Sequence, residues 1–319
     1  MSLAALPDRD RYSLATLKKM LMRHDPVMLR EVLEVLNLRP GAVVVDGTLG
    51  LAGHAREFAR VVAPGTVVGL DWDQSMLAEA RERLGAADGR DEHGNRVDLV
   101  HADYRQMPQV MADLGLRADG ILLDLGLNSA QIEDPERGIA FKTEGPLDMR
   151  MDRSRGETAS SLLNRLGPVE IERLLWDYGD ERWAKAIAKQ VVERRRENPL
   201  RTTNDLVEAV LAAVPPKARD KRIHAATRTF QAIRIAVNRE LDDLEGAIQG
   251  AAESLAPGGR LAVLSYHSGE DRAAKVVFRA LADEGWEELF RKPVTPTAEE
   301  IARNPRARSA KLRAIGRPA

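Results

Sequence analysis

The sequence predicts an α/β protein with a doubly wound, mostly parallel β-sheet and an inserted helical domain. Short apolar runs in the first 126 residues alternate with helical stretches rich in Ala, Glu and Arg, a pattern typical of parallel sheets. A further apolar run begins only at residue 259. The gap before it is far longer than the roughly one dozen residues that a crossover helix needs, so we expect an insertion there.

The expected strands are the apolar runs themselves, at residues 42–46, 66–71, 96–103, 118–126 and 259–267. Residues 24–36 have the apolar spacing of a helix before the first strand. The insertion contains helical segments at 169–179, 182–198 and 202–214, and Thr202 or Thr203 can cap the last of them. A longer helix is expected over about 225–255, where apolar residues recur at steps of three and four until Pro-Gly-Gly at 257–259.

This pattern predicts how the chain divides into domains. Residues 1–23 are expected to be an N-terminal extension. Residues 24–135 and 225–319 together are expected to form the ligand-binding sheet domain, and residues 136–224 the inserted helical domain, which we expect to recognise the substrate.

The composition narrows the classes of function. The 48 Lys and Arg residues balance the 49 Asp and Glu residues, so nucleic-acid binding would depend on local basic patches. The lack of cysteine excludes disulfides, thiolate zinc sites and cysteine nucleophiles, and the histidines show no metal-ligand spacing, so no metal site is predicted. No apolar run approaches the roughly 20 residues that span a bilayer, and a signal-peptide pattern is missing. We therefore expect a soluble cytoplasmic protein with no membrane partner.

A glycine-rich turn follows the first predicted strand, in the sequence VVVDGTLGLAGH of Val43 to His54. Such a turn can bring backbone N–H groups close to a ligand, although the same spacing also occurs without one. Asp46 disfavours a pyrophosphate, and the Gly-Lys-Ser/Thr of a phosphate-binding loop is missing. Asp71 ends the second strand, where an acid can bind ribose hydroxyls. A cationic adenosine ligand, S-adenosylmethionine (SAM), fits better than a dinucleotide, and Asp46 can equally serve as a cap of the loop.

Further polar residues end the next strands, at the edge of the sheet where ligands of this fold class bind. Asp103 and Tyr104 follow the third strand, and Tyr104 can lie against an adenine or can be a half-buried aromatic of the sheet edge. Asp124 comes directly after a buried run, where an unpaired carboxylate is costly, which favours a functional role. His267 ends the fifth strand and faces the same edge, and its role stays open.

Several separate stretches resemble one family, the bacterial RsmH (MraW) methyltransferases. HDPVML at 24–29 resembles the family's HxPVLL, and VDGTLGLAGH at 45–54 resembles its DGTxGxGGH. DLGLNSAQIEDPERGIAF at 124–141 matches DLGVSSPQLDDxxRGFSF without a gap, and GPLDMRMD follows it at 145–152. The resemblance is completed by TRTFQAIRIAVNREL at 227–241, GGRLAVLSYHSGEDR at 258–272 and NPRARSAKLR at 304–313.

The resemblance implies a Rossmann-like class I SAM methyltransferase. Its members use SAM to methylate N4 of a cytidine in the decoding centre (P site) of small-subunit (16S) ribosomal RNA, so the implied partner is 16S rRNA within the small ribosomal subunit. By position, the resemblance also implies the residues that contact SAM, which are Ala52, Gly53, His54, Asp71, Tyr104, Asp124 and Gln131. It assigns no catalytic residue, and the sequence predicts no oligomeric state.

The chain departs from the family pattern at a few positions. Ala52 replaces a glycine inside the cofactor loop, where a positive φ becomes costly. Asn128 and Ala130 replace Ser and Pro, Ile139 and Ala140 replace Phe and Ser, and Gly269 replaces Leu. These departures bear on activity and on the target base more than on fold or cofactor.

Charged segments and alternative functions complete the predictions. Residues 303–319 carry six Lys and Arg and no acid, which favours contact with RNA, whereas Arg194 to Arg196 are expected to be a solvated helix end. Asp148, Arg150 and Asp152 can either shape a loop or guide the substrate.

An NAD-type dehydrogenase and a noncatalytic RNA-binding or ribosome-assembly protein are the alternatives to a methyltransferase.

Overall fold

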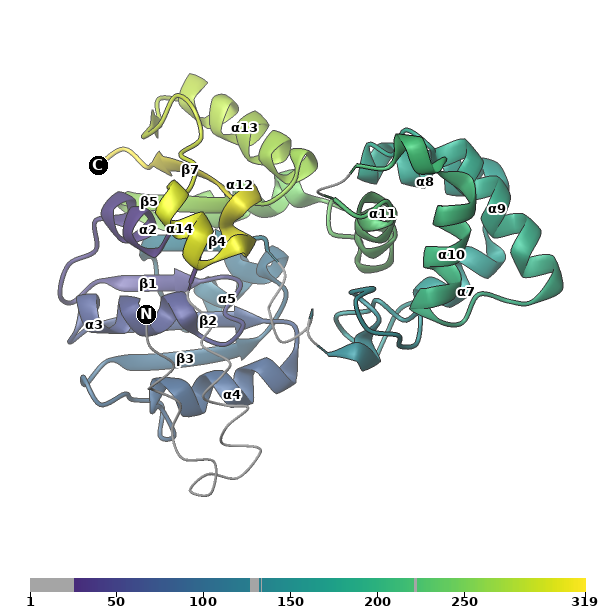
Figure 1. The fold of residues 1–319 in the computed structure, drawn as a ribbon. Coiled ribbons are helices and arrows are strands. Elements are labelled where there is room, and N and C mark those ends of the chain that lie inside the picture. The colour runs from purple at the N-terminus through teal and green to yellow at the C-terminus, as the bar shows by residue number, and fades with distance from the viewer. Residues whose placement is uncertain (1–25, 127–131, 133, 221–222) are drawn as a thin grey trace, which may run out of the picture.

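The computed structural model describes residues 26–319 except 127–131, 133 and 221–222. Over these residues the chain forms a seven-stranded sheet with the order β3-β2-β1-β4-β5-β7-β6 (Figure 1). The strands β1 to β5 pair in parallel, and β7 pairs antiparallel with β5 and β6. The strands are β1 Val43–Asp46, β2 Thr66–Asp71, β3 Arg96–His101, β4 Ala118–Asp124, β5 Leu255–Ser265, β6 Glu287–Glu288 and β7 Lys311–Gly316. The predicted doubly wound, mostly parallel sheet is confirmed.

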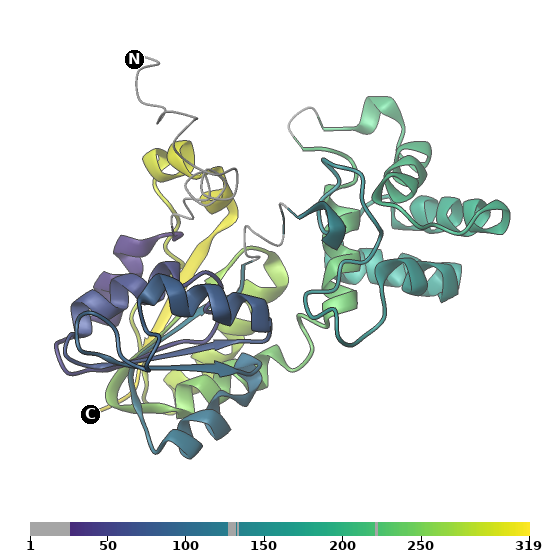
Figure 2. The ribbon, with the colours of Figure 1, turned by 90° about the horizontal axis from the view of Figure 1, so that it is seen from below.

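Helices cover both faces of the sheet, because successive strand residues point to opposite sides. Val44 and Val67 belong to one apolar core with α2, α3 and α4, and their neighbours Val45 and Val68 belong to the other with α5, α12 and α13 (Figure 2). These helices are α2 Leu29–Leu36, α3 Gly53–Val62, α4 Gln74–Leu84, α5 Met107–Leu114, α12 Leu244–Glu253 and α13 Ser268–Asp283. The helix predicted over 24–36 thus begins at Leu29 in the described part of the chain.

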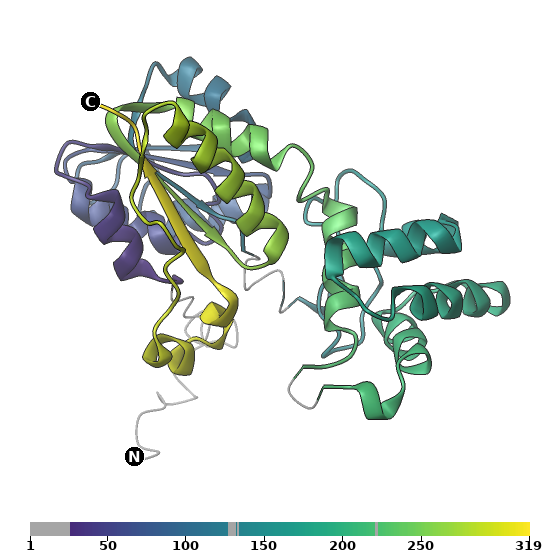
Figure 3. The ribbon, with the colours of Figure 1, turned by 90° about the horizontal axis from the view of Figure 1, so that it is seen from above.

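The insertion forms a helical unit with its own apolar core, to one side of the sheet (Figures 1 and 3). Its helices are α7 Ala159–Arg165, α8 Pro168–Gly179, α9 Ala184–Glu197, α10 Thr203–Ala213 and α11 Thr227–Asn238. Thr202 caps α10, since its side chain accepts the N–H of Asp205 and the Asp205 carboxylate accepts the N–H of Thr202. The three helices predicted in the insertion are therefore confirmed as α8, α9 and α10.

The single helix expected over 225–255 is wrong. The chain leaves the helical path between α11 and α12, where Arg239 and Asp243 have φ angles of 54° and 52°. The two halves bury different faces, because Ile233 of α11 packs in the helical unit and Ile248 of α12 packs beneath the sheet. The guanidinium of Arg105 donates to the carbonyls of residues 239 and 242 and fixes the turn. We propose that the helical unit extends to residue 238 rather than ending at 224.

The C-terminal segment completes the edge of the sheet. It contains α14 Ala298–Arg303 and β7, and short 3-10 helices are η1 Tyr104–Gln106, η2 Pro135–Arg137, η3 Pro216–Ala218 and η4 Pro305–Ser309. Lys311 and Arg313 pair with Asp271 at 2.9 and 2.7 Å, and Arg317 donates to the carbonyl of Leu255. Three basic side chains that were expected to contact RNA therefore help to stabilise the fold, namely those of Lys311, Arg313 and Arg317. Within the described residues, we find no helix with the length and apolar character that crossing a membrane requires.

Candidate active site

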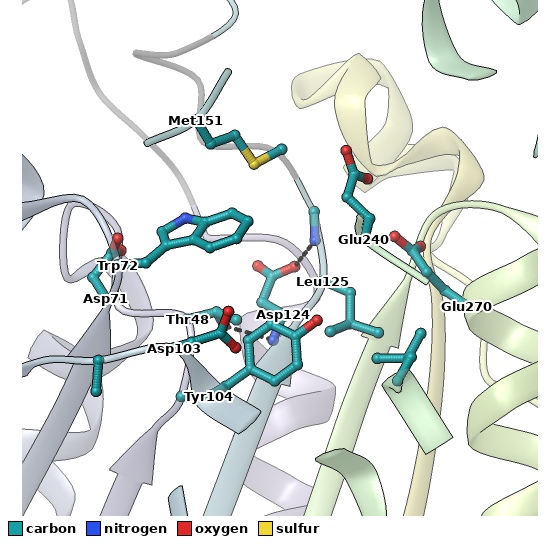
Figure 4. A pocket seen from close by; sticks show the side chains of 14 residues that line it. Thr48, Asp71, Trp72, Asp103, Tyr104, Asp124, Leu125, Met151, Glu240 and Glu270 are labelled. Atoms are coloured by element: carbon teal, nitrogen blue, oxygen red, sulfur yellow. Dashed lines mark hydrogen bonds between the residues drawn. The ribbon is translucent and has the colours of Figure 1, made fainter. Parts of the chain in front are cut away.

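A pocket lies at the carboxyl ends of the parallel strands (Figure 4). Because parallel strands end at one edge of the sheet, residues far apart in the sequence meet there. The pocket is lined by Gly47, Thr48, Asp71, Trp72, Ala102, Asp103, Tyr104, Asp124, Leu125, Gly126, Met151, Glu240, Leu244 and Glu270.

Buried carboxylates hold the glycine-rich turn after β1. Asp46 is 2% exposed and accepts the N–H of Thr48 at 3.2 Å, while Asp71 accepts the N–H groups of Gly50 and Asp73, both at 2.8 Å. Burial raises the pKa of Asp46 to about 7, helped by neighbouring carboxylates, and burial raises the pKa of Asp71 to about 6. Asp46 thus acts as a cap of the loop, one of the roles left open by the sequence, whereas Asp71 also faces the pocket.

The predicted cofactor residues Ala52, Gly53 and His54 lie at the start of α3. Ala52 has the left-handed φ of 57° and packs in the core, and α3 begins at Gly53. His54 is buried, with Nε2 3.0 Å from the carbonyl of Val27 and Nδ1 3.8 Å from Oδ2 of Asp124. Burial lowers the pKa of His54, although the charge of Asp124 opposes this shift. These three residues are not part of the pocket lining, and their contact with SAM stays a prediction.

Aromatic side chains lie on the β2 and β3 side of the pocket (Figure 4). Trp72 comes directly after Asp71, and Tyr104 begins η1, which Asp103 caps by accepting the N–H of Arg105 at 2.9 Å. Aromatic faces beside a ribose-binding acid suit an adenine ring. Trp72 was missed in the sequence, and its position next to the predicted ribose-binding acid is the signal that could have indicated it.

Asp124 lies between the two sides of the pocket (Figure 4). Its N–H donates to Oγ1 of Thr48 at 2.7 Å, and its Oδ1 accepts the N–H of Gly126 at 3.3 Å. Burial, followed by the charge and hydrogen bond of Asp124, raises the pKa of Tyr266 well above its usual range. Gln131 lies outside the described residues. Three of the predicted cofactor residues therefore meet in this pocket, namely Asp71, Tyr104 and Asp124.

The side of the pocket opposite Trp72 carries glutamates that the sequence did not indicate (Figure 4). Glu240 lies in the connection between α11 and α12. Its two oxygens accept hydrogen bonds from Nε and from a terminal nitrogen of Arg234, both at 2.8 Å. Glu270 lies in the first turn of α13, where it follows His267 by three residues. The capping spacing after a strand was a signal for Glu270, but the hidden break in the predicted long helix concealed Glu240.

The segment of residues 145–152 connects the helical unit to the pocket. Asn238 of α11 accepts the N–H of Met151 at 2.8 Å, and the Met151 side chain reaches the pocket (Figure 4). Arg150 donates from Nε to Asp148 at 2.7 Å. Burial raises the pKa of Asp148, but the hydrogen bonds and charge of Arg150 outweigh it and hold the pKa below its usual range. Of the two roles considered for these charges, the geometry therefore supports shaping of the loop.

The charge of the pocket decides which ligand fits it. Among the described residues its lining includes five carboxylates, from Asp71, Asp103, Asp124, Glu240 and Glu270, and no Lys or Arg. Such a lining repels the pyrophosphate of a dinucleotide and attracts a cation. Together with Asp71, the acid predicted to bind ribose, and the aromatic faces, this favours a positively charged adenosine over NAD. The fold and the site define the class of SAM-dependent methyltransferases.

Comparison with known proteins identifies the family. The MraW methylase family matches residues 21–318, and the chain belongs to this family. The chain is similar to the ribosomal RNA small subunit methyltransferase H of Heliobacterium modesticaldum, with 46% identity over 92% of this chain and 98% of the relative. It is also similar to the protein of the same name from Symbiobacterium thermophilum, with 44% identity over 93% and 97%. The predicted resemblance is confirmed, and SAM is the cofactor.

A solved structure shows a more distant likeness. The rRNA methylase from Streptococcus thermophilus has 11% sequence identity and a TM-score of 0.40, and the match covers 91% of this chain and 94% of that chain.

Proposed function

We propose that this protein transfers a methyl group from SAM to N4 of a cytidine in the decoding centre (P site) of 16S ribosomal RNA. Family membership carries the proposal, because relatives with 44% and 46% identity over nearly their whole length are named ribosomal RNA small subunit methyltransferases. The resemblance of the motifs supplies the base and the atom. The small ribosomal subunit is then the partner, and the cytoplasm is the place of action.

The residues present fit SAM. When bound, SAM supplies an electrophilic methyl group on a positively charged sulfur. Asp71 would accept hydrogen bonds from the ribose, Trp72 and Tyr104 would lie against the adenine, and Asp124 would stabilise positive charge. The other contacts implied by the resemblance remain part of the proposal, and they are Ala52, Gly53, His54 and Gln131.

The methyl acceptor needs alignment more than activation by a strong base. The lone pair of cytosine N4 is delocalised into the ring, so holding the amine in line and excluding water are the main tools of the protein. The target base must also leave its stack in the RNA, which costs a few kcal/mol. Side chains that position the flipped base would therefore supply much of the catalytic effect.

A groove next to the pocket offers a path for the RNA. This groove shares Trp72 and Asp103 with the pocket. Its charged lining residues come from both the sheet domain and the helical unit, and they are four arginines, Arg105, Arg150, Arg155 and Arg239, and four aspartates, Asp103, Asp152, Asp242 and Asp243. Each arginine pairs with a nearby aspartate, so an RNA phosphate would share these guanidinium groups with the pairs that shape the groove. Guanidinium groups suit RNA phosphates. We infer that the backbone around the target follows this groove, with the inserted helical domain recognising the substrate.

Small ribosomal subunits that lack the modification provide the test. With SAM as donor we expect one new methyl group per subunit, mapped by mass spectrometry to N4 of a cytidine. A methyl group on a carbon or on a ribose would refute the assigned atom. Binding of subunits and SAM without methyl transfer would instead support a noncatalytic RNA-binding or assembly role. Calorimetry should show binding of SAM but not of NAD.

A further inference from the structure

Glu240 and Glu270 line the side of the pocket opposite Asp71 and Trp72 (Figure 4), and His267 lies beside them in a cluster of three polar side chains. Glu240 lies between α11 and α12, His267 caps α13 and Glu270 lies in the first turn of α13. One nitrogen or oxygen atom of each of the three lies within 4.8 Å of the others. Because the acids and aromatic rings that suit adenosine lie across the pocket, this cluster is placed to meet the methyl acceptor.

The two glutamates differ in the groups that already bind their oxygens. Both oxygens of Glu240 are held by the guanidinium of Arg234, at 2.8 Å each. Glu270 accepts the N–H groups of Tyr266 and His267 with Oε2 alone, at 2.7 and 3.2 Å. In the described part of the chain, its Oε1 accepts no backbone hydrogen bond. A carboxylate bound to a guanidinium is a weak proton acceptor, so Glu270 is the stronger candidate of the two.

His267 supplies an independent observation that points to a ligand. Its side chain is 9% exposed, and Nδ1 accepts the N–H of Glu270 at 3.4 Å, so a neutral ring carries its proton on Nε2. Nε2 lies 3.0 Å from Oε1 of Glu270, yet it makes no hydrogen bond with any described residue. Leaving a buried donor without a partner is costly. A group that enters here and realigns the imidazole and the carboxylate would remove that cost.

We propose that Glu270 is a catalytic residue, positioned by His267, that binds the amino group of the target base and accepts its proton. This inference rests on the proposed function. The amine nitrogen forms a bond to the methyl carbon, the carbon–sulfur bond breaks with its electron pair going to sulfur, and the surplus proton passes from nitrogen to Oε1 of Glu270. An acceptor for the N–H also increases the electron density on a nitrogen whose lone pair is delocalised. Asp124 is less suited, because the proposed function uses its charge to stabilise the positive charge of SAM.

The variant Glu270→Gln separates the chemical role from the structural one. The glutamine carbonyl can still accept the N–H groups of Tyr266 and His267, so the cap of α13 is kept while the proton acceptor is lost. With saturating RNA and SAM, we expect the rate of methyl transfer to fall about 10²- to 10⁴-fold. The SAM affinity measured by calorimetry and the melting temperature should stay at their wild-type values.

Glu170→Gln is a matched control. Glu170 has the same place in the first turn of α8, where it accepts the N–H of Gly167 at 2.7 Å, and it is outside the pocket lining. This variant should methylate at the wild-type rate. Glu270→Asp retains a carboxylate on a shorter side chain and should retain more activity than Glu270→Gln.

The pH dependence of the rate tests the partnership with His267. A proton acceptor must be ionised, so the wild-type rate should fall as the pH is lowered, and this acid limb should disappear in Glu270→Gln. His267→Gln removes the ring N–H that faces the carboxylate and should move the acid limb to higher pH without changing SAM affinity. A role of His267 in capping alone would leave the limb where it is.

Two outcomes would overturn the inference. One is methylation by Glu270→Gln at the wild-type rate. The other is one tightly held divalent cation per chain by elemental analysis, with loss of activity on chelation, because the cluster would then be a metal site. A wild-type protein that fails to methylate the subunit would refute the proposed function instead, so the two failures can be told apart.

Discussion

Asp46 and Asp71, in and beneath the pocket, differ from Asp148 and Asp271, just outside it, in the direction in which their pKa values are shifted. Asp46 and Asp71 lie among other carboxylates, and burial raises their pKa values to about 7 and about 6. Asp148 and Asp271 are also partly buried, but hydrogen bonds from basic side chains outweigh burial and lower their pKa values. The charges of Asp148 and Asp271 therefore stabilise the fold. Asp46 and Asp71 lower its stability when they are ionised, and Asp71 places negative charge where a cationic ligand can bind.

The largest effect is expected for Asp46→Asn. Asparagine can still accept the N–H of Thr48, but it cannot ionise. Because the pKa of Asp46 rises from 3.8 to about 7 on folding, the wild type loses stability as the pH rises through that interval. We expect the variant to be more stable by up to about 4 kcal/mol at pH 8, with the gain shrinking toward pH 5. Urea unfolding across this range of pH measures the gain in stability. A gain that does not depend on pH would contradict the claim that burial raises the pKa of Asp46.

Asp148→Asn should show the opposite dependence on pH. A lowered pKa contributes stability above the pKa of the unfolded chain, and this contribution is lost as the pH falls through the folded value. Removal of the charge that holds Arg150 should cost about 2 kcal/mol at pH 7, and the cost should shrink below about pH 4. Asp177→Asn is the control, because its pair with Arg173 is exposed and should contribute less than about 0.5 kcal/mol. Equal losses in both variants would remove the contrast between the two sets of acids.

Much of the fold could be predicted because the strands are short, apolar and separated by helices. Their alternation fixed the parallel sheet, and the long gap before residue 259 indicated the insertion. The break at 239–243 could not be seen, because apolar steps of three and four continue across it while the helix changes the core that it faces. The strand β7 was missed because its basic residues suggested RNA, whereas Lys311 and Arg313 pair with Asp271.

The site was predicted on one side of the pocket only. Asp71, Tyr104 and Asp124 could be found because each follows a predicted strand, and parallel strands end together. Glu240 could not be placed without knowledge of the turn that carries it. Glu270 was missed although its spacing from His267 is that of a helix cap, and capping occupies only one of its oxygens.

The affinity for SAM should depend on pH, because Asp71 in the pocket has a raised pKa. If SAM binds when Asp71 is ionised and can accept both ribose hydrogen bonds, a pKa of about 6 predicts that affinity rises about tenfold between pH 5 and pH 7.5. Calorimetry at several pH values measures this. Asp71→Asn should bind more weakly and lose this dependence. The same slope in the variant would assign it to another group.

Ala52→Gly should have the smallest effect, although it restores the glycine of the family pattern. Ala52 has a φ of 57°, which costs an L-residue about 1 kcal/mol, and glycine removes this strain. Glycine also loses more entropy on folding, and the buried methyl group that it lacks contributes about 0.8 kcal/mol. These terms oppose each other, so we expect stability to change by less than about 0.5 kcal/mol in urea unfolding.

The affinity for SAM should also change less than about twofold in Ala52→Gly, because the side chain packs in the core and does not line the pocket. A loss or gain of tenfold would mean that the backbone at this position touches the cofactor, as the resemblance implies, and that the conformation of the turn controls the contact. A small change would mean that alanine is tolerated here because its methyl group packs in the core beneath the turn. In that case the acids, rather than the loop backbone, would determine how tightly the cation is held.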